Sequence, residues 1–120
     1  MASYFDIYEQ IILKFPVEQK KFLIALNNTI SELFAEYGEI VFVDNTPPTA
    51  DIQWSDIVSG LKVCFKPLFV PAVVDNIIYL LNTTADNVGY KQEFMRKARQ
   101  AFLKYWNDNA KGRRVKKIGW

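Results

Sequence analysis

Hydrophobic residues recur at spacings of three and four along most of the chain, which is the period of an amphipathic α-helix. The first such stripe follows Ser3, which together with Asp6 resembles a capping box with Asp in place of the usual Glu. The pattern therefore predicts a helix that begins near Ser3. It reaches about Phe15, and its apolar positions are Phe5, Tyr8, Ile11, Ile12 and Phe15.

A proline and a glycine bound the second predicted helix. Pro16 ends the first helix and is compatible with the first position of the next. The apolar stripe then continues from Val17 to Tyr37, and Gly38 is a plausible C-terminal cap. Four β-prone residues follow, Ile40 to Val43, which predict a short strand or an extended arm. The two prolines that come next indicate a loop over residues 45–49.

The middle of the chain predicts a third helix and then a change of direction. Asp51 or Ser55 can cap a helix that reaches about Phe65. Pro67 and Pro71 break the pattern after it. The apolar positions of this helix are Trp54, Ile57, Val58, Leu61 and Phe65.

Two further helices and a tail complete the pattern. Residues Val73 to Leu81 are apolar nearly all round, which predicts the most buried helix. Asn87 can cap a last helix that runs to about Asn109. Its apolar face is opposed by a basic face of Lys91, Arg96, Lys97, Arg99 and Lys104. Lys111 to Trp120 has no periodic apolar face, so we expect an extended tail.

These elements predict a mostly α fold of one domain. We expect a small bundle of about five helices over residues 1–110, with at most one short strand or extended arm, and a basic extended tail over residues 111–120. The most apolar stretch, Leu68 to Leu81, is 14 residues long and contains Pro71 and Asp75. It is too short to span a bilayer, so no membrane partner is predicted and a soluble intracellular protein is the default.

Composition argues against catalysis. The chain has no histidine, which excludes a Ser-His-Asp or Cys-His arrangement and removes the commonest metal ligand. Its one cysteine, Cys64, lies in an apolar run and is expected to be a reduced, buried thiol. Glu32 and Glu36 are four residues apart, and two solvated carboxylates are favoured over a shared cation. No glycine-rich phosphate loop occurs. We predict no enzyme activity, no cofactor and no metal.

Charge is distributed unevenly along the sequence. Residues 1–90 contain 5 Lys/Arg and 11 Asp/Glu, whereas residues 91–120 contain 10 Lys/Arg and 2 Asp/Glu. This asymmetry favours contact between unlike surfaces of two copies, or an acidic partner for the C-terminal part, over a merely solvated basic face. The tail combines this charge with Val115, Ile118 and Trp120 as apolar anchors, which is typical of a segment that inserts into a partner.

The residue pattern also resembles a known family. The run D-I-Q-W-S-D in the middle of the sequence, an apolar helix ahead of a turn, and a final helix Y-K-Q-E-F-M-R-K-A-R-Q-A-F-L-K-Y-W with a basic tail are similar to the head–tail connector (adaptor) proteins of tailed bacteriophages. The resemblance covers roughly residues 17–120 and rests on pattern rather than on a signature motif. Met1 to Phe15 has no clear counterpart, which leaves room for a different small phage or bacterial protein.

The resemblance implies a structural virion protein of the neck, made in the host cytoplasm. Such subunits form a ring, commonly of twelve copies, below the portal protein and in contact with tail components, and DNA passes through the lumen as cargo. The tail would insert into the portal through Arg113, Arg114, Val115, Lys116, Lys117, Ile118 and Trp120. Candidates for contacts to the next subunit are Ile40, Phe42, Asn45, Pro47, Pro48 and Trp54.

Two other functions stay open. A small nucleic-acid-binding or packaging accessory protein would use Arg96, Lys97, Arg99 and the basic tail on phosphates. Against this, no helix-turn-helix spacing and no aromatic stacking motif is apparent. A phage-encoded inhibitor would instead dock on a host protein through exposed aromatic side chains.

Overall fold

The computed structural model describes residues 2–14, 16–82 and 87–118, and for residues 109–118 it describes the backbone alone. In this part the protein is mostly helical and contains no named strand, which confirms the predicted fold class. The α-helices are α1 (Tyr4–Ile12), α2 (Gln19–Tyr37), α3 (Trp54–Val58), α4 (Val70–Leu81) and α5 (Val88–Ile118). Three short 3-10 helices join them, η1 (Gly38–Val41), η2 (Val43–Asn45) and η3 (Pro67–Phe69).

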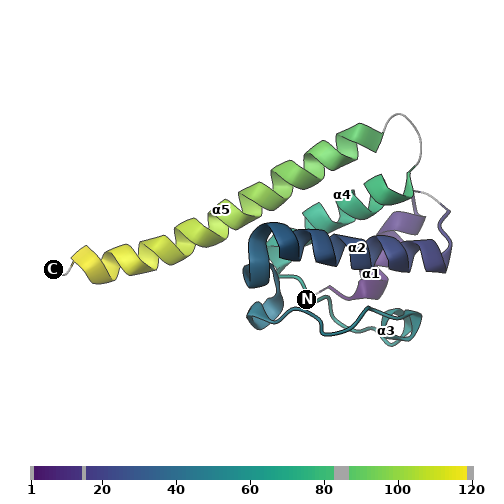
Figure 1. Ribbon diagram of the computed structural model, residues 1–120, viewed down its shortest axis with the longest axis horizontal. Helices are drawn as coiled ribbons and strands as arrows, with labels where there is room; N and C mark the ends of the chain where they lie inside the picture. Colours follow the sequence, from purple (N-terminus) through teal and green to yellow (C-terminus); the bar gives the residue numbers. More distant parts are fainter. Residues whose placement is uncertain (1, 15, 83–86, 119–120) are drawn as a thin grey trace.

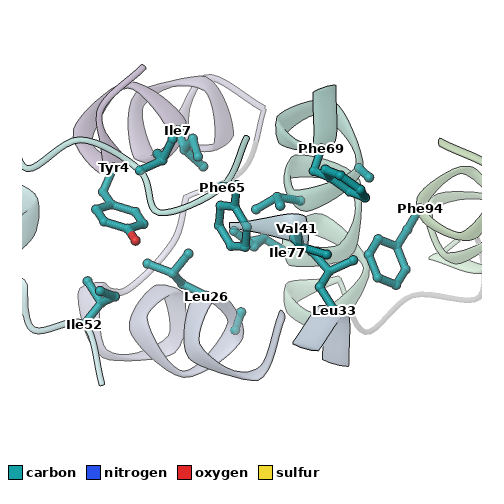
Figure 2. Close-up of a cluster of buried hydrophobic side chains, with 14 of the residues drawn as sticks. Tyr4, Ile7, Leu26, Leu33, Val41, Ile52, Phe65, Phe69, Ile77 and Phe94 are labelled. Carbon is teal, nitrogen blue, oxygen red and sulfur yellow. The ribbon is translucent and has the colours of Figure 1, made fainter. Parts of the chain in front are cut away.

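Helix α4 lies at the centre of the molecule, packed between α2 and α5 (Figure 1). Its sequence predicts this position, because Val73, Ile77 and Ile78 on successive turns are completely buried. Pro71 does not break the helix but lies in its first turn, where a proline removes no hydrogen bond. Val73, Ile77 and Ile78 belong to one buried hydrophobic cluster (Figure 2). It also contains side chains from other parts of the fold, including Tyr4, Leu26, Val41, Phe65 and Phe94.

Helix α1 begins as its sequence predicts. The Ser3 hydroxyl accepts a hydrogen bond from the Asp6 backbone N–H, and the Asp6 carboxylate accepts one from the Ser3 backbone N–H. The helix ends at Ile12, before the expected Phe15, which lies outside the described residues. Tyr4, the first residue of α1, is buried, and its hydroxyl accepts a hydrogen bond from the Cys64 backbone N–H at 3.0 Å.

The predicted strand at Ile40 to Val43 is replaced by two 3-10 turns. Only Phe42, which joins η1 to η2, is extended, and it forms a single antiparallel bridge with Phe65. The Val43 N–H donates to the Cys64 carbonyl, and the Lys66 N–H donates to the Val41 carbonyl. The backbone hydrogen bonds of this segment are therefore made within its own turns and to one neighbouring segment. A longer strand pairing is not required to satisfy them.

The third helix is much shorter than the sequence predicts. It ends at Val58, and Gly60 adopts a φ of 77°, a left-handed conformation that terminates a helix. Residues 61–65 then form no helix, and Lys62 forms an antiparallel bridge with Ser3. Leu61 and Phe65 therefore do not share a helical face with Trp54, although Phe65 is still fully buried.

Helix α5 extends beyond the expected end at Asn109, and its backbone is helical to Ile118. The physical reason is that Lys and Arg are good helix formers and no proline follows Pro71 in the sequence. The C-terminal half of α5 projects away from the body, so the molecule measures 57 × 33 × 23 Å (Figure 1).

Candidate assembly surface on helix α5

The N-terminal half of α5 is anchored to the body by a narrow apolar stripe. Phe94, Ala98 and Ala101 are buried, and half-buried Phe102 continues the stripe. The Phe102 ring lies 5.0 Å from the ring of Tyr37 at the end of α2. Since two of the three buried residues are alanines, the α5 backbone lies close to the elements beneath it.

A buried polar network also ties α5 to α2 and α4. The completely buried Asn76 amide donates to the Thr29 hydroxyl at 2.9 Å and to the Glu32 carboxylate at 3.2 Å. Lys91 of α5 forms an ion pair with Glu32 at 3.1 Å and donates to the Asn76 carbonyl at 3.4 Å. The Lys91 ammonium also lies 4.8 Å from the centre of the Phe94 ring. A polar group buried this deeply is tolerated because each of its atoms has a partner.

A second ion pair joins α5 to α4. The Lys97 ammonium lies 2.6 Å from the carboxylate of Asp75, which is 9% exposed. On the outer surface of α5, Arg96 pairs with Glu93 one turn away. The hydrogen bonds from Arg96 lower the pKa of the Glu93 carboxyl group, so this pair stays ionised in mild acid.

These contacts divide the predicted basic face of α5. Lys91 and Lys97 flank the apolar stripe and point into the body, while Arg96, Arg99 and Lys104 are exposed. A period of 3.6 residues places Lys91 and Lys97 on the two flanks of the apolar stripe and Arg96 and Arg99 on the opposite side of the helix, so helical spacing already separates the first two from these exposed cations. The sequence also indicates that α4 needs polar partners. Asp75 and Asn76 interrupt an otherwise apolar helix, and buried polar groups of this kind require polar partners from another element.

A groove of about 580 Å³ lies between the C-terminal half of α2 and the first turns of α5. Its buried floor includes Leu33, Phe94 and Ala98, and Met95 is 59% exposed on the α5 wall. Glu36 lies on the α2 wall and Arg99 on the α5 wall. Tyr37 also lines the groove. Burial raises the pKa of its hydroxyl, the negative charge of Glu36 raises this pKa further, and the positive charge of Arg99 lowers it.

Beyond the groove, α5 separates from the body. Near the point of separation the Lys66 ammonium lies 4.0 Å from the centre of the Tyr105 ring, and Trp106 stacks on Phe102 and is 52% exposed. The helix backbone then continues to Ile118 with no element of the body alongside it (Figure 1). The predicted inserting side chains lie on this part of the protein or past it, outside the side chains that the structure describes: Arg113, Arg114, Val115, Lys116, Lys117, Ile118 and Trp120.

The predicted subunit contacts separate into core and surface residues. Phe42 is completely buried and has no exposed side chain to offer a neighbour. Trp54 is half-buried and packs edge-on against the Tyr8 ring at 5.1 Å. Ile40 is half-buried, and exposed Asn45 accepts a hydrogen bond from Lys66.

Pro47 and Pro48 lie together at the surface. They line a groove of about 350 Å³ with Ile30, Ser31 and Phe34 of α2, and the Phe34 side chain is 43% exposed. Of the six predicted contact residues, these two prolines therefore belong to an apolar surface that another protein can cover.

The described residues contain no cluster of three His, Cys, Asp or Glu side chains placed to hold a metal ion. Cys64 is half-buried rather than fully buried, and burial raises the pKa of its thiol to about 11, so the reactive thiolate is scarce at neutral pH. Across the same residues, no helix is both long enough and apolar enough to cross a membrane.

No protein-family model matches the sequence, and neither the curated proteins nor the solved structures contain a match.

Proposed function

We propose that this protein is a structural connector subunit, similar to the head–tail connector proteins of tailed bacteriophages. In this proposal the subunits assemble as a ring, of about twelve copies, below a portal protein in the virion neck. The C-terminal segment of each subunit inserts into the portal, tail components bind below, and DNA passes through the lumen without being held. The activity is assembly and not catalysis.

One observation carries the proposal: α5 is far longer than the body that holds it. Its buried stripe ends at Ala101 and Phe102, yet the helix backbone continues to Ile118 (Figure 1). The projecting part contains five Lys/Arg and no acidic residue between 111 and 118, together with Val115 and Ile118. This segment has no element of the body alongside it, so a partner that receives it would supply the tertiary contacts that stabilise most helices in proteins.

The arrangement suits a ring because many weak attachments add up. If each copy contributes one inserting segment, modest affinity per segment becomes strong attachment through avidity. Neighbouring copies would meet through the apolar surface of Phe34, Pro47 and Pro48. The first 90 residues carry a net charge of −6, which would discourage a lumen lined by them from gripping DNA.

The nucleic-acid alternative receives less support from the geometry. Lys97, one of its three proposed phosphate contacts on α5, is paired with Asp75 inside the fold, and Arg96 is paired with Glu93. Arg99 and the projecting segment would remain for phosphates. Binding of that kind would be weak, insensitive to sequence and strongly weakened by salt.

The deciding experiment is sedimentation with the portal ring encoded by the same genome. We expect the full-length protein to co-sediment with the ring at both low and high salt, because apolar anchors are not screened by ions. A truncated protein ending at Ala110 should remain in the supernatant. Salt-sensitive binding to added DNA with no binding to the portal would contradict the proposal, and so would attachment that survives the truncation.

Two matched variants separate apolar anchoring from charge. Replacing Ile118 and Trp120 by Ser removes two of the three apolar anchors and retains every cation, whereas replacing Lys116 and Lys117 by Ser removes two of the five cations and retains every anchor. The first variant should fail to co-sediment at high salt. The second should lose mainly its rate of attachment at low salt, because charge steers association more than it holds a complex.

A further inference from the structure

The α2–α5 groove is self-complementary in charge, independently of the C-terminal segment. Its α2 wall exposes the carboxylate of Glu36, and its α5 wall exposes the guanidinium of Arg99. No ion pair between described residues includes either side chain. An acidic wall and a basic wall therefore lie on opposite sides of one apolar floor.

The floor itself is incompletely covered by the rest of the subunit. Leu33, Phe94 and Ala98 form its buried part, but Met95 remains 59% exposed at the edge, and Ala35 on the opposite wall is exposed as well. Methionine is flexible and polarizable, so it adapts readily to an apolar surface laid against it. The groove thus presents what a small protein interface requires, an apolar centre with charged edges.

We propose that this groove pairs with the same groove of a second copy of the protein. A two-fold axis running along the groove places each acidic wall opposite the other copy's basic wall, whereas an axis across the groove would set like charges against each other. Glu36 of each copy then meets the partner's Arg99, and each Met95 packs over the partner's Ala35. Such an interface is isologous, since the same patch is used by both subunits.

This pairing is separate from the proposed connector ring. A two-fold contact closes on itself after two copies, whereas a ring needs a head-to-tail contact between different surfaces. The proposed dimer is therefore a state of the protein that has not assembled into the ring. It involves neither the projecting part of α5 nor the surface formed by Phe34, Pro47 and Pro48.

Charge reversal tests the pairing directly. The wild-type protein should sediment as a concentration-dependent dimer. Glu36→Arg alone, or Arg99→Glu alone, places two like-charged contacts in the pair and should weaken it by roughly tenfold or more. When the two variants are mixed, each unlike contact is restored, so the mixture should form a one-to-one heterodimer. Native mass spectrometry with one variant isotopically labelled would identify it.

Two controls keep the result interpretable. Glu9→Arg and Lys20→Glu make the same charge changes at exposed positions outside the groove and should dimerise like the wild type. Circular dichroism should show that all variants keep their helical content, because Glu36 and Arg99 are exposed. A wild-type monomer at every concentration, an oligomer unaffected by the single reversals, or a mixture that does not pair would each overturn the proposal.

Discussion

Asn76 is the residue at which three helices meet. It is completely buried on α4, it donates to Thr29 and Glu32 of α2, and it accepts from Lys91 of α5. Its amide is suited to this position because it offers both donors and an acceptor without a charge of its own. A carboxylate there would face Glu32, and an aliphatic side chain would leave the polar atoms of its neighbours with fewer partners.

We expect Asn76→Ala to lower the free energy of unfolding by roughly 2 kcal/mol, because it opens a small cavity and removes buried hydrogen bonds. Urea denaturation followed by circular dichroism measures the change. Asn28→Ala on the exposed face of α2 serves as the control and should change stability by less than about 0.5 kcal/mol. Equal stabilities for the two variants would show that the network contributes nothing.

Asp6 gives the stability of α1 a predictable dependence on pH. Hydrogen bonds from the Ser3 backbone N–H and hydroxyl lower the pKa of the Asp6 carboxyl group below its unfolded value of about 3.9. Asp6 is therefore protonated less readily in the folded protein than in the unfolded chain. The ionised carboxylate stabilises the fold above the unfolded pKa, and this stabilisation is lost as the pH falls through the lowered pKa of the folded state.

Asp6→Ala should therefore destabilise the protein at neutral pH, and the difference from the wild type should shrink as the pH falls below about 4. Denaturant titrations at several pH values would measure it. Glu9→Ala, exposed on the same helix, is the control for general surface charge. A difference that is constant with pH would mean that the capping carboxylate does not contribute through its ionised form.

At the scale of elements, glycine and proline explain the end of α2, the end of α3 and the start of α4. Gly38 ends α2 as the sequence indicates, and Pro71 starts α4 because its ring suits the first turn. The third helix was predicted too long because Leu61 and Phe65 continue the helical spacing past Gly60. The left-handed φ of that glycine and the backbone bonds made by residues 61–66 outweigh the spacing.

Two glycines with open space around them make a matched pair of substitutions. Gly60 has a φ of 77° and Gly89 does not have a positive φ, and neither would meet an atom within 4 Å if a Cβ were added. Gly60→Ala should destabilise the fold by roughly 1 kcal/mol through backbone strain, whereas Gly89→Ala in α5 should stabilise it by about 0.5 kcal/mol. Thermal unfolding would show opposite shifts in Tm, and shifts of the same sign would refute this account of the end of α3.

For the whole molecule, the hydrophobic core lies in the body and not in the projecting part of α5. All the buried hydrophobic side chains among the described residues lie between Tyr4 and Ala101. Loss of the segment after Ala110 therefore removes no described core contact.

A truncated protein ending at Ala110 should consequently unfold with a free energy within about 0.5 kcal/mol of the full-length protein, although the proposed function requires it to lose attachment to the portal. Urea denaturation of the two proteins side by side measures this. A marked loss of stability on truncation would show that the end of α5 folds back onto the body in solution.

The sequence by itself determined the mostly helical class, the capping box at Ser3, the central position of α4 and the uneven charge, because each depends on local spacing or on composition. Tertiary structure decided which polar residues are structural. Lys91 and Lys97 border the apolar stripe of α5 by their spacing, but only the fold shows that Glu32 and Asp75, distant in sequence, are the partners that hold them against the body. It also decided that Phe42 belongs to the core and that α2 and α5 enclose a groove, since both depend on segments meeting across the fold.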